Sequence, residues 1–290
     1  MDLAQKIAEE IYELGIREDD CILVHAGVRD IIRELSSKSL SPAQQLHLAC
    51  SALYDGLMDI LGPDGTLCVP GYFYDYARFG AAFDARFSPP DRSLGAFAKF
   101  FFNEKMTGRS SCPSVSLMAT GSRAGEVCAH ARVPFGFGSL SPWEKLVDLD
   151  GAMIFTGASI NRMTFVHHAE SKAGVPHLYN KIYDSPITDF QGDRVEFAVS
   201  AVRYLDERFG IIPDFSQLEI DMRAEGLLSE KTLFSSPLCV VRFKDAFNFI
   251  LERLRQNPFY LLSSRPRFEP GLIPLDGLTG PQNQKLANPN

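Results

Sequence analysis

The feature that most limits how this chain can fold is a strand, a helix and a second strand in immediate succession. Cys21–Val24 has the pattern of a short buried strand, and the Ser-Pro pair at 41–42 caps a helix that continues to Leu61. The turn at 62–65 ends that helix, and Thr66–Pro70 is the next strand. This order is typical of an α/β fold in which at least part of the sheet is parallel.

The remaining elements follow from the spacing of apolar residues along the chain. Helices are predicted over 2–15, 94–102, 164–173, 214–225 and 244–254, and strands over 114–119, 152–157, 195–204 and 238–241. The strand over 195–204 alternates as antiparallel strands do, so the sheet is expected to be mixed. The aromatic stretch 71–92 is predicted to be a loop. We expect one domain over 1–262 and an extended or disordered tail over 263–290.

Composition narrows the class of protein and of partner. The chain has 290 residues, 45% of them hydrophobic, which is ordinary globular material. Its net charge of −7 without any basic run argues against nucleic acid, so small molecules are the expected partners. No apolar run is long enough for a membrane span and no leader is apparent, so we expect a cytoplasmic protein. The tail could reach a neighbouring subunit in a homo-oligomer.

The segment Thr164–Glu170 holds the closest grouping of side chains suited to catalysis, two adjacent histidines and a glutamate. On a helix, His167 lies beside Glu170 and His168 beside Thr164. A carboxylate one turn from His167 could accept one ring N–H and leave the other ring nitrogen free as a base near neutral pH. Two ordinary helix histidines, one buried and one solvated, would give the same pattern.

Two loops could bind a ligand. His25, Ala26, Gly27 and Val28 follow the first strand, and the carboxyl ends of strands are where α/β sheets tend to bind ligands. A glycine-rich loop leads to Ser141 at a helix start, where free backbone N–H groups can hold a phosphate or an oxyanion. A plain capped loop is equally consistent with the second pattern.

Aromatic residues of the stretch 71–92 could line a substrate cleft. Tyr72 and Tyr74 are the first tyrosines of this stretch. Aromatic rings in loops at sheet ends bury much area and often set specificity. The same rings could instead pin a long loop to the core.

Four stretches, in the same order and spacing, resemble the aminoglycoside 3-N-acetyltransferase family over about 22–262. They are Leu23-Val24-His25, the run 61–67 that reads LGPDGTL, the run 138–146 that contains SPWEKL, and Thr164–Glu170 followed by AGVP at 173–176. The resemblance implies a three-layer α/β/α sandwich around a mixed β-sheet. It also implies transfer of an acetyl group from the co-substrate acetyl-CoA to a small-molecule amine.

In this resemblance His167 takes the position of the catalytic histidine. An ammonium must lose a proton before it attacks a thioester, and histidine, with a usual pKa of about 6.5, suits that role. Glu170 would orient the ring and stabilise the imidazolium, as a triad carboxylate does. The amine can attack the thioester directly, so no covalent enzyme intermediate is needed.

Further residues are assigned to the two ligands of this reaction. Coenzyme A is expected at the loop of His25, Ala26, Gly27 and Val28 and at Ser141. The amine is expected at Tyr72, Tyr74, Thr164 and His168. No metal is expected.

Departures from the family pattern concern the substrate. Ala26-Gly27 stands where family members usually carry serines, and Cys112-Pro113 where they carry His-Pro. The stretch 72–90 holds only Asp75 and Asp84 as acids, although aminoglycosides are polycations. We therefore favour an amino sugar, linked to a nucleotide or taken from biosynthesis, over an antibiotic.

Three other readings remain open. Metal-assisted hydrolysis through His25, a histidine of the 167–168 pair and a carboxylate is disfavoured, because adjacent histidines do not share a helix face and no His-x-x-x-His spacing exists. Cys112 could act as a nucleophile paired with His167. A binding protein that keeps the fold without catalysis is the third. Within the favoured class of acetyltransferases, an aminoglycoside 3-N-acetyltransferase that confers antibiotic resistance is the alternative to an enzyme for amino sugars.

Overall fold

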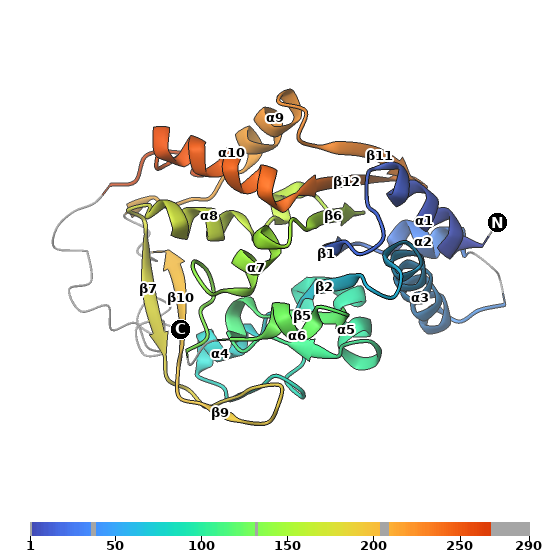
Figure 1. Cartoon of the computed structure of the whole chain (residues 1–290), viewed down its shortest axis with the longest axis horizontal. Coiled ribbons are helices and arrows are strands. Elements are labelled where there is room, and N and C mark those ends of the chain that lie inside the picture. The colour runs from blue at the N-terminus through green and yellow to red at the C-terminus, as the bar shows by residue number, and fades with distance from the viewer. Residues whose placement is uncertain (1, 36–38, 131–132, 204–208, 268–290) are drawn as a thin grey trace.

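The computed structural model describes residues 2–35, 39–130, 133–203 and 209–267, and shows helices packed around a central sheet (Figure 1). Its helices are α1 Leu3–Glu13, α2 Arg29–Glu34, α3 Pro42–Leu61, α4 Tyr74–Phe79, α5 Gly95–Glu104, α6 Ala124–Cys128, α7 Pro142–Asp148, α8 Val166–Ala173, α9 Ser216–Ala224 and α10 Phe243–Gln256. Its strands are β1 Cys21–Ala26, β2 Thr66–Pro70, β3 Phe83–Asp84, β4 Gly108–Arg109, β5 Leu117–Gly121, β6 Ala152–Thr156, β7 Leu178–Tyr183, β8 Ile187–Thr188, β9 Arg194–Val195, β10 Ala198–Arg203, β11 Ser229–Leu233 and β12 Ser236–Arg242.

The main sheet of the described chain has seven strands in the order β11-β12-β6-β1-β2-β5-β4. β1 runs parallel to β6 and β2, whereas β12, β11, β5 and β4 are antiparallel to their neighbours. The three parallel strands therefore deliver their carboxyl ends to one edge, side by side. The predicted α/β fold with a mixed sheet is confirmed.

Helices cover both faces of this sheet. Leu23 of β1 packs into a core with α7, α8 and α10, whereas Ile22 and Val24 pack into a second core with α1, α3 and α5. This alternation along one strand is what a sheet buried on both faces requires. The three-layer arrangement implied by the family resemblance is thus present.

The strong helix start at 41–42 has the geometry that its residues predict. The Ser41 hydroxyl accepts a hydrogen bond from the Gln44 backbone N–H at 3.3 Å, and the Gln44 side chain accepts one from the Ser41 N–H at 2.9 Å. This capping box satisfies two N–H groups that a helix start leaves unpaired. The helix α3 that it begins ends at Leu61, as predicted.

Several predicted elements were wrong. The supposed loop 71–92 contains α4 and β3, because aromatic side chains at four of the five positions 72–76 hid the helical spacing. The strand expected over 195–204 is divided between β9 and β10; β10 pairs with the unpredicted β7 in a separate two-stranded sheet. The strand expected over 114–119 begins only at Leu117, because Pro113 starts a short 3-10 helix. The edge strand β11 was also missed, since its exposed polar residues carry no apolar pattern.

The start of the proposed tail is tied to the rest of the chain. The N–H groups of Ser263 and Arg267 donate to the carbonyls of Ile212 and Phe209, each at 2.9 Å. Residues 268–290 lie outside the described residues.

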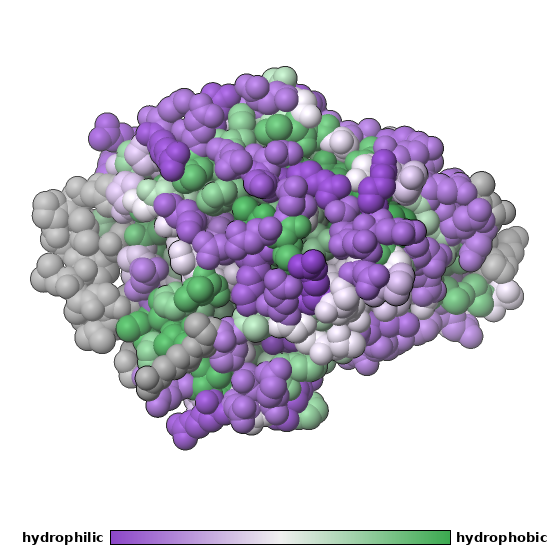
Figure 2. All heavy atoms as spheres, in the orientation of Figure 1, coloured by the Kyte–Doolittle hydropathy of each residue, from purple (hydrophilic) through white to green (hydrophobic). Residues whose placement is uncertain are grey.

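Hydrophilic residues cover most of the face shown in Figure 2, and apolar residues gather at its lower left. None of the described helices combines the length and the apolar character that crossing a membrane requires.

Candidate functional site

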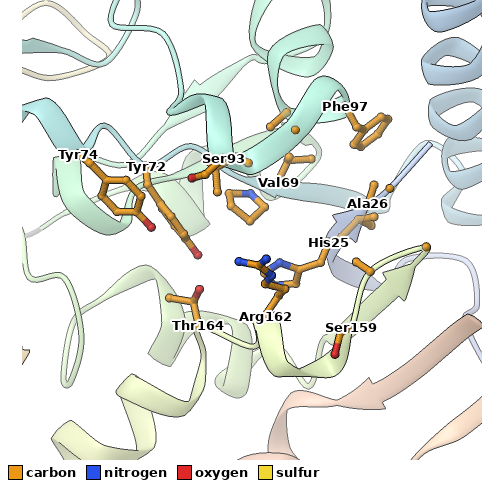
Figure 3. Close-up of a pocket in the computed structure, with 18 residues that line it drawn as sticks. His25, Ala26, Val69, Tyr72, Tyr74, Ser93, Phe97, Ser159, Arg162 and Thr164 are labelled. Atoms are coloured by element: carbon orange, nitrogen blue, oxygen red, sulfur yellow. The ribbon is translucent and has the colours of Figure 1, made fainter. Parts of the chain in front are cut away.

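A cavity of about 450 Å³ opens where the parallel strands β1, β2 and β6 end (Figure 3). We call it the strand-end cavity. Its wall is built from the ends of these strands and from the segments that follow them, and consists of Val24, His25, Ala26, Gly27, Val69, Pro70, Tyr72, Tyr74, Ser93, Leu94, Gly95, Phe97, Ala98, Gly157, Ala158, Ser159, Arg162 and Thr164. This is the position that the topology of an α/β sheet favours for a ligand.

Two glycines allow the ends of β1 and β6 to come together at this cavity. A Cβ atom on Gly27 would lie 2.3 Å from the carbonyl oxygen of Gly157, and one on Gly157 would lie 2.5 Å from the carbonyl oxygen of Gly27. Gly157 also has a φ of +57°, a left-handed conformation that glycine adopts without strain. The Gly27 N–H donates to the Thr156 carbonyl at 2.7 Å, so it is not available to an oxyanion.

His25 forms part of the cavity wall and is neutral at physiological pH. Its ring stacks on Phe155 with a centroid distance of 5.0 Å. Its Nε2 atom is buried without a hydrogen-bond partner, and burial lowers the pKa of the ring to about 4. His25 can therefore offer an N–H or a lone pair to a bound molecule, but no charge.

A second cavity, of about 330 Å³, lies between α4, α8 and the β7–β10 pair. We call it the histidine cavity because His167 is in its wall. The wall consists of Tyr74, Ala77, Arg78, Ser114, Val115, Phe137, Thr164, His167, Leu178, Tyr179, Tyr183, Ser200, Ala201, Val202 and Arg203. Tyr74 and Thr164 line both cavities. The two spaces therefore adjoin beside the start of α8.

The His167 ring is held by a buried carboxylate. Its Nδ1 lies 2.6 Å from Oε2 of Glu170, and a second imidazole, that of His177, places Nε2 at 2.9 Å from Oε1 of the same carboxylate. Phe137 and Phe215 meet the His167 ring edge-on at centroid distances of 5.7 and 6.2 Å. These contacts fix the plane of the ring and leave its Nε2 as the nitrogen not bonded to the carboxylate.

Glu170 stays ionised although it is almost completely buried. Burial alone would raise the pKa of Glu170, but the hydrogen bonds and charges of His167 and His177 outweigh it and lower the pKa to about 2. An ionised carboxylate accepts hydrogen bonds and donates none. It therefore holds the proton of His167 on Nδ1 and leaves the Nε2 lone pair unprotonated in the neutral ring.

His177 was missed in the sequence. It follows the left-handed turn at Gly174, which ends α8 and sends the chain back beside Glu170. Because the contact depends on this turn and not on helical spacing, no local period marks the residue. The only available signal was its position close behind a glycine-ended helix.

Four predicted site residues do not reach either cavity wall: Glu170, which lies behind His167, and the three described next. His168 is buried against Phe165 and Phe247, and its Nδ1 accepts the Gly138 N–H at 3.3 Å. Val28 is buried in the core beneath the β1 loop. The hydroxyl of Ser141, also fully buried, accepts the Glu144 N–H.

The start of α7 is closed to an anion. Besides the Ser141 cap, the Glu144 carboxylate accepts the Leu140 N–H at 2.6 Å. A negative charge already occupies the position that a phosphate would need.

The structure also bears on the hypotheses of a Cys112 nucleophile and of a metal site. Cys112 is buried, lines neither cavity, and burial raises the pKa of its thiol to about 12. Across the described ranges, no group of three or more His, Cys, Asp or Glu side chains is arranged to hold a metal ion.

The site and fold define a class: an α/β protein with a histidine held by a buried carboxylate in the wall of one of two adjoining cavities. The family model for aminoglycoside 3-N-acetyltransferases matches residues 24–255, and the chain belongs to that family. Its activity class is accordingly that of an N-acyltransferase.

Relatives and solved structures agree with this membership. Aminoglycoside N(3)-acetyltransferase III of Pseudomonas aeruginosa is 26% identical over 196 residues, which is 62% of this chain and 68% of the relative. Aminoglycoside N(3)-acetyltransferase IX of Micromonospora chalcea is 24% identical over 269 residues, 85% of this chain and 91% of the relative. The structure of AAC-IIIb binary with CoASH has a TM-score of 0.69 at 22% identity, covering 90% of this chain and 97% of that one.

Proposed function

We propose that this chain transfers the acetyl group of acetyl-CoA to an amine, with His167 as general base and Glu170 as the residue that positions it. The observation that carries the proposal is the Nδ1 contact of 2.6 Å between His167 and Glu170, beside the junction of the two cavities. The relative solved with CoASH supports coenzyme A as the leaving group.

The strand-end cavity is our candidate for the acetyl-CoA site, and the histidine cavity for the amine. His25, Ala26 and Gly27 would contact the cofactor, and Tyr74 and Thr164 would lie between the two substrates. Tyr72 lines the strand-end cavity but not the histidine cavity, so we assign it to the cofactor site and not to the amine site. This division puts the thioester and the amine next to each other without a covalent enzyme intermediate.

The reaction follows from the His167 tautomer. The amine nitrogen attacks the thioester carbon, and Nε2 of His167 takes a proton from that nitrogen as the N–C bond forms. The carbon–sulfur bond then breaks, and the departing thiolate takes the proton back from the imidazolium. Glu170 stabilises the imidazolium between these two steps, through the contact it already makes.

The acceptor that we favour is an amino sugar, linked to a nucleotide or drawn from biosynthesis. Asp84 pairs with Arg86, Asp75 is exposed, and neither lines the histidine cavity. An aminoglycoside is the second candidate, because the relatives that the chain resembles are named for it.

The proposal is tested by measuring thiol release from acetyl-CoA in the presence of aminoglycosides, nucleotide amino sugars and simple amines. We expect one class of amine to release thiol and to yield its N-acetyl product by mass spectrometry. The proposal would be refuted if no amine releases thiol and acetyl-CoA has no effect on the melting temperature.

A further inference from the structure

The wall of the histidine cavity contains a guanidinium for which the described residues supply no hydrogen-bond partner. Arg203, the last residue of β10, has its Nη1 atom buried without a hydrogen-bond partner. Within the described ranges its side chain makes no hydrogen bond and no ion pair. Guanidinium groups remain protonated in proteins, so this is a partly buried positive charge directed at a ligand space.

The described residues place no carboxylate in the cavity wall to neutralise this charge. Among the described lining residues there is no Asp or Glu, and a second arginine, Arg78, lies over the Tyr74 ring at 5.0 Å. The carboxylate that interacts electrostatically with the Arg203 guanidinium is that of Glu170. Its two oxygens already accept hydrogen bonds from His167 and His177.

The charges of this wall suit an anion and oppose a polycation. Taking a charge out of water is costly unless a partner compensates it, and the planar guanidinium fork matches a carboxylate or a phosphate with two parallel hydrogen bonds. A ligand with several ammonium groups would instead place like charges beside Arg203 and Arg78. The volume of about 330 Å³ is at the lower end of ordinary small-molecule sites, roughly 300–1,000 Å³.

We propose that the acceptor is an amine that carries a carboxylate or a phosphate, with the anionic group bound by Arg203 and the amino group facing His167. This inference rests on the proposed acetyl transfer and specifies its substrate. Tyr74 and Phe137 also line this cavity and supply aromatic surface for the body of the substrate.

The test compares three amines with the same sugar ring and one polycation. Glucosamine, glucosamine 6-phosphate and 2-amino-2-deoxyglucuronic acid differ only at C6, and kanamycin represents the polycations. We expect kcat/KM for thiol release to be at least about 100-fold higher for one or both anionic sugars than for glucosamine. Preference for the phosphate or for the carboxylate identifies which anion the site takes.

Arg203→Gln assigns that preference to the guanidinium. It should raise KM for the anionic sugar about 100-fold, change kcat/KM for glucosamine less than about threefold, and leave KM for acetyl-CoA unchanged. Arg203→Lys keeps the charge without the fork and should give an intermediate KM. Arg253→Gln, on α10 outside both cavity walls, is the matched control and should behave as wild type.

The segment 204–208 supplies a further comparison, because it holds Asp206 and Glu207 in the sequence and lies outside the described residues. Kanamycin turnover that survives Arg203→Gln and is lost in the Asp206→Asn/Glu207→Gln double variant would overturn the inference and leave acetyl transfer intact. An equal loss for all amines in Arg203→Gln would also overturn it. Absence of thiol release with all four amines would overturn this inference. The proposed function would fall with it only if the other amines of its test also release no thiol and acetyl-CoA leaves the melting temperature unchanged.

Discussion

Replacing Glu170 with glutamine should remove a specific part of the acid sensitivity of the fold. The carboxyl has a pKa of about 2 in the folded protein, against 4.5 for the free side chain. At about 1.4 kcal/mol per pKa unit, this difference corresponds to on the order of 3 kcal/mol of folding stability. Because the pKa is depressed, that contribution is complete above about pH 4.5 and is lost as the pH falls towards 2.

The glutamine variant cannot titrate at this position, and its amide can accept only one of the two imidazole N–H groups. We therefore expect Glu170→Gln to be less stable than wild type by about 3 kcal/mol at pH 7, and the difference to shrink towards zero as the pH falls from 4.5 to 2. Urea unfolding followed by circular dichroism at pH 7, 5, 4 and 3 measures this difference. Titration of His25 and His168, neither of which is bonded to Glu170, is common to both proteins and cancels.

Glu144→Gln is the control for this experiment. Glu144 is a partly exposed carboxylate paired with Lys172 at 2.7 Å, so its replacement should change stability by less than about 1 kcal/mol. If the difference in unfolding free energy between wild type and Glu170→Gln stays constant from pH 7 to pH 3, Glu170 is not a buried carboxylate that accepts hydrogen bonds from two histidines.

Three further predictions concern single residues. Burial lowers the pKa of His168 to about 4, so its contribution is lost as the pH falls from 6.5 to 4; His168→Asn should lack roughly 2–3 kcal/mol of the stability loss that wild type shows between pH 7 and 4.5 in urea unfolding. Gly27→Ala places a Cβ atom 2.3 Å from a carbonyl oxygen and should cost about 1–3 kcal/mol, seen as a lower melting temperature; an unchanged melting temperature would contradict the close approach of the strand ends. Cys112→Ser should keep thiol release within about threefold of wild type, because the buried thiol has a pKa of about 12, and complete loss of activity would instead favour a cysteine nucleophile.

The parts of the fold that could be predicted are those with local signals. The capped helix α3 and the buried strands β1, β2 and β6 each carry their pattern within a few residues, and all were found. The strand β7, which pairs with β10, was missed. Its own burial does not alternate cleanly enough to mark it as a strand.

In the candidate site, too, contacts between residues close in sequence could be predicted, whereas contacts between distant segments could not. The contact between His167 and Glu170 is a one-turn helical pair and could be read from spacing. The second partner of Glu170, His177, is brought in by a turn, and the partly buried guanidinium of Arg203 by a distant strand. Ser141 and His168 had suitable chemistry in the sequence, but their backbone and packing partners could be seen only in the folded chain.

The central claim is that Nε2 of His167 deprotonates the acceptor amine. It is tested most directly by comparing His167→Ala with wild type for two quantities: kcat for thiol release with the amine that wild type accepts, and the Kd for acetyl-CoA by titration calorimetry. We predict that kcat falls by about 10²–10⁴-fold while the Kd stays within about threefold. A variant that binds acetyl-CoA and retains the wild-type kcat would contradict the account.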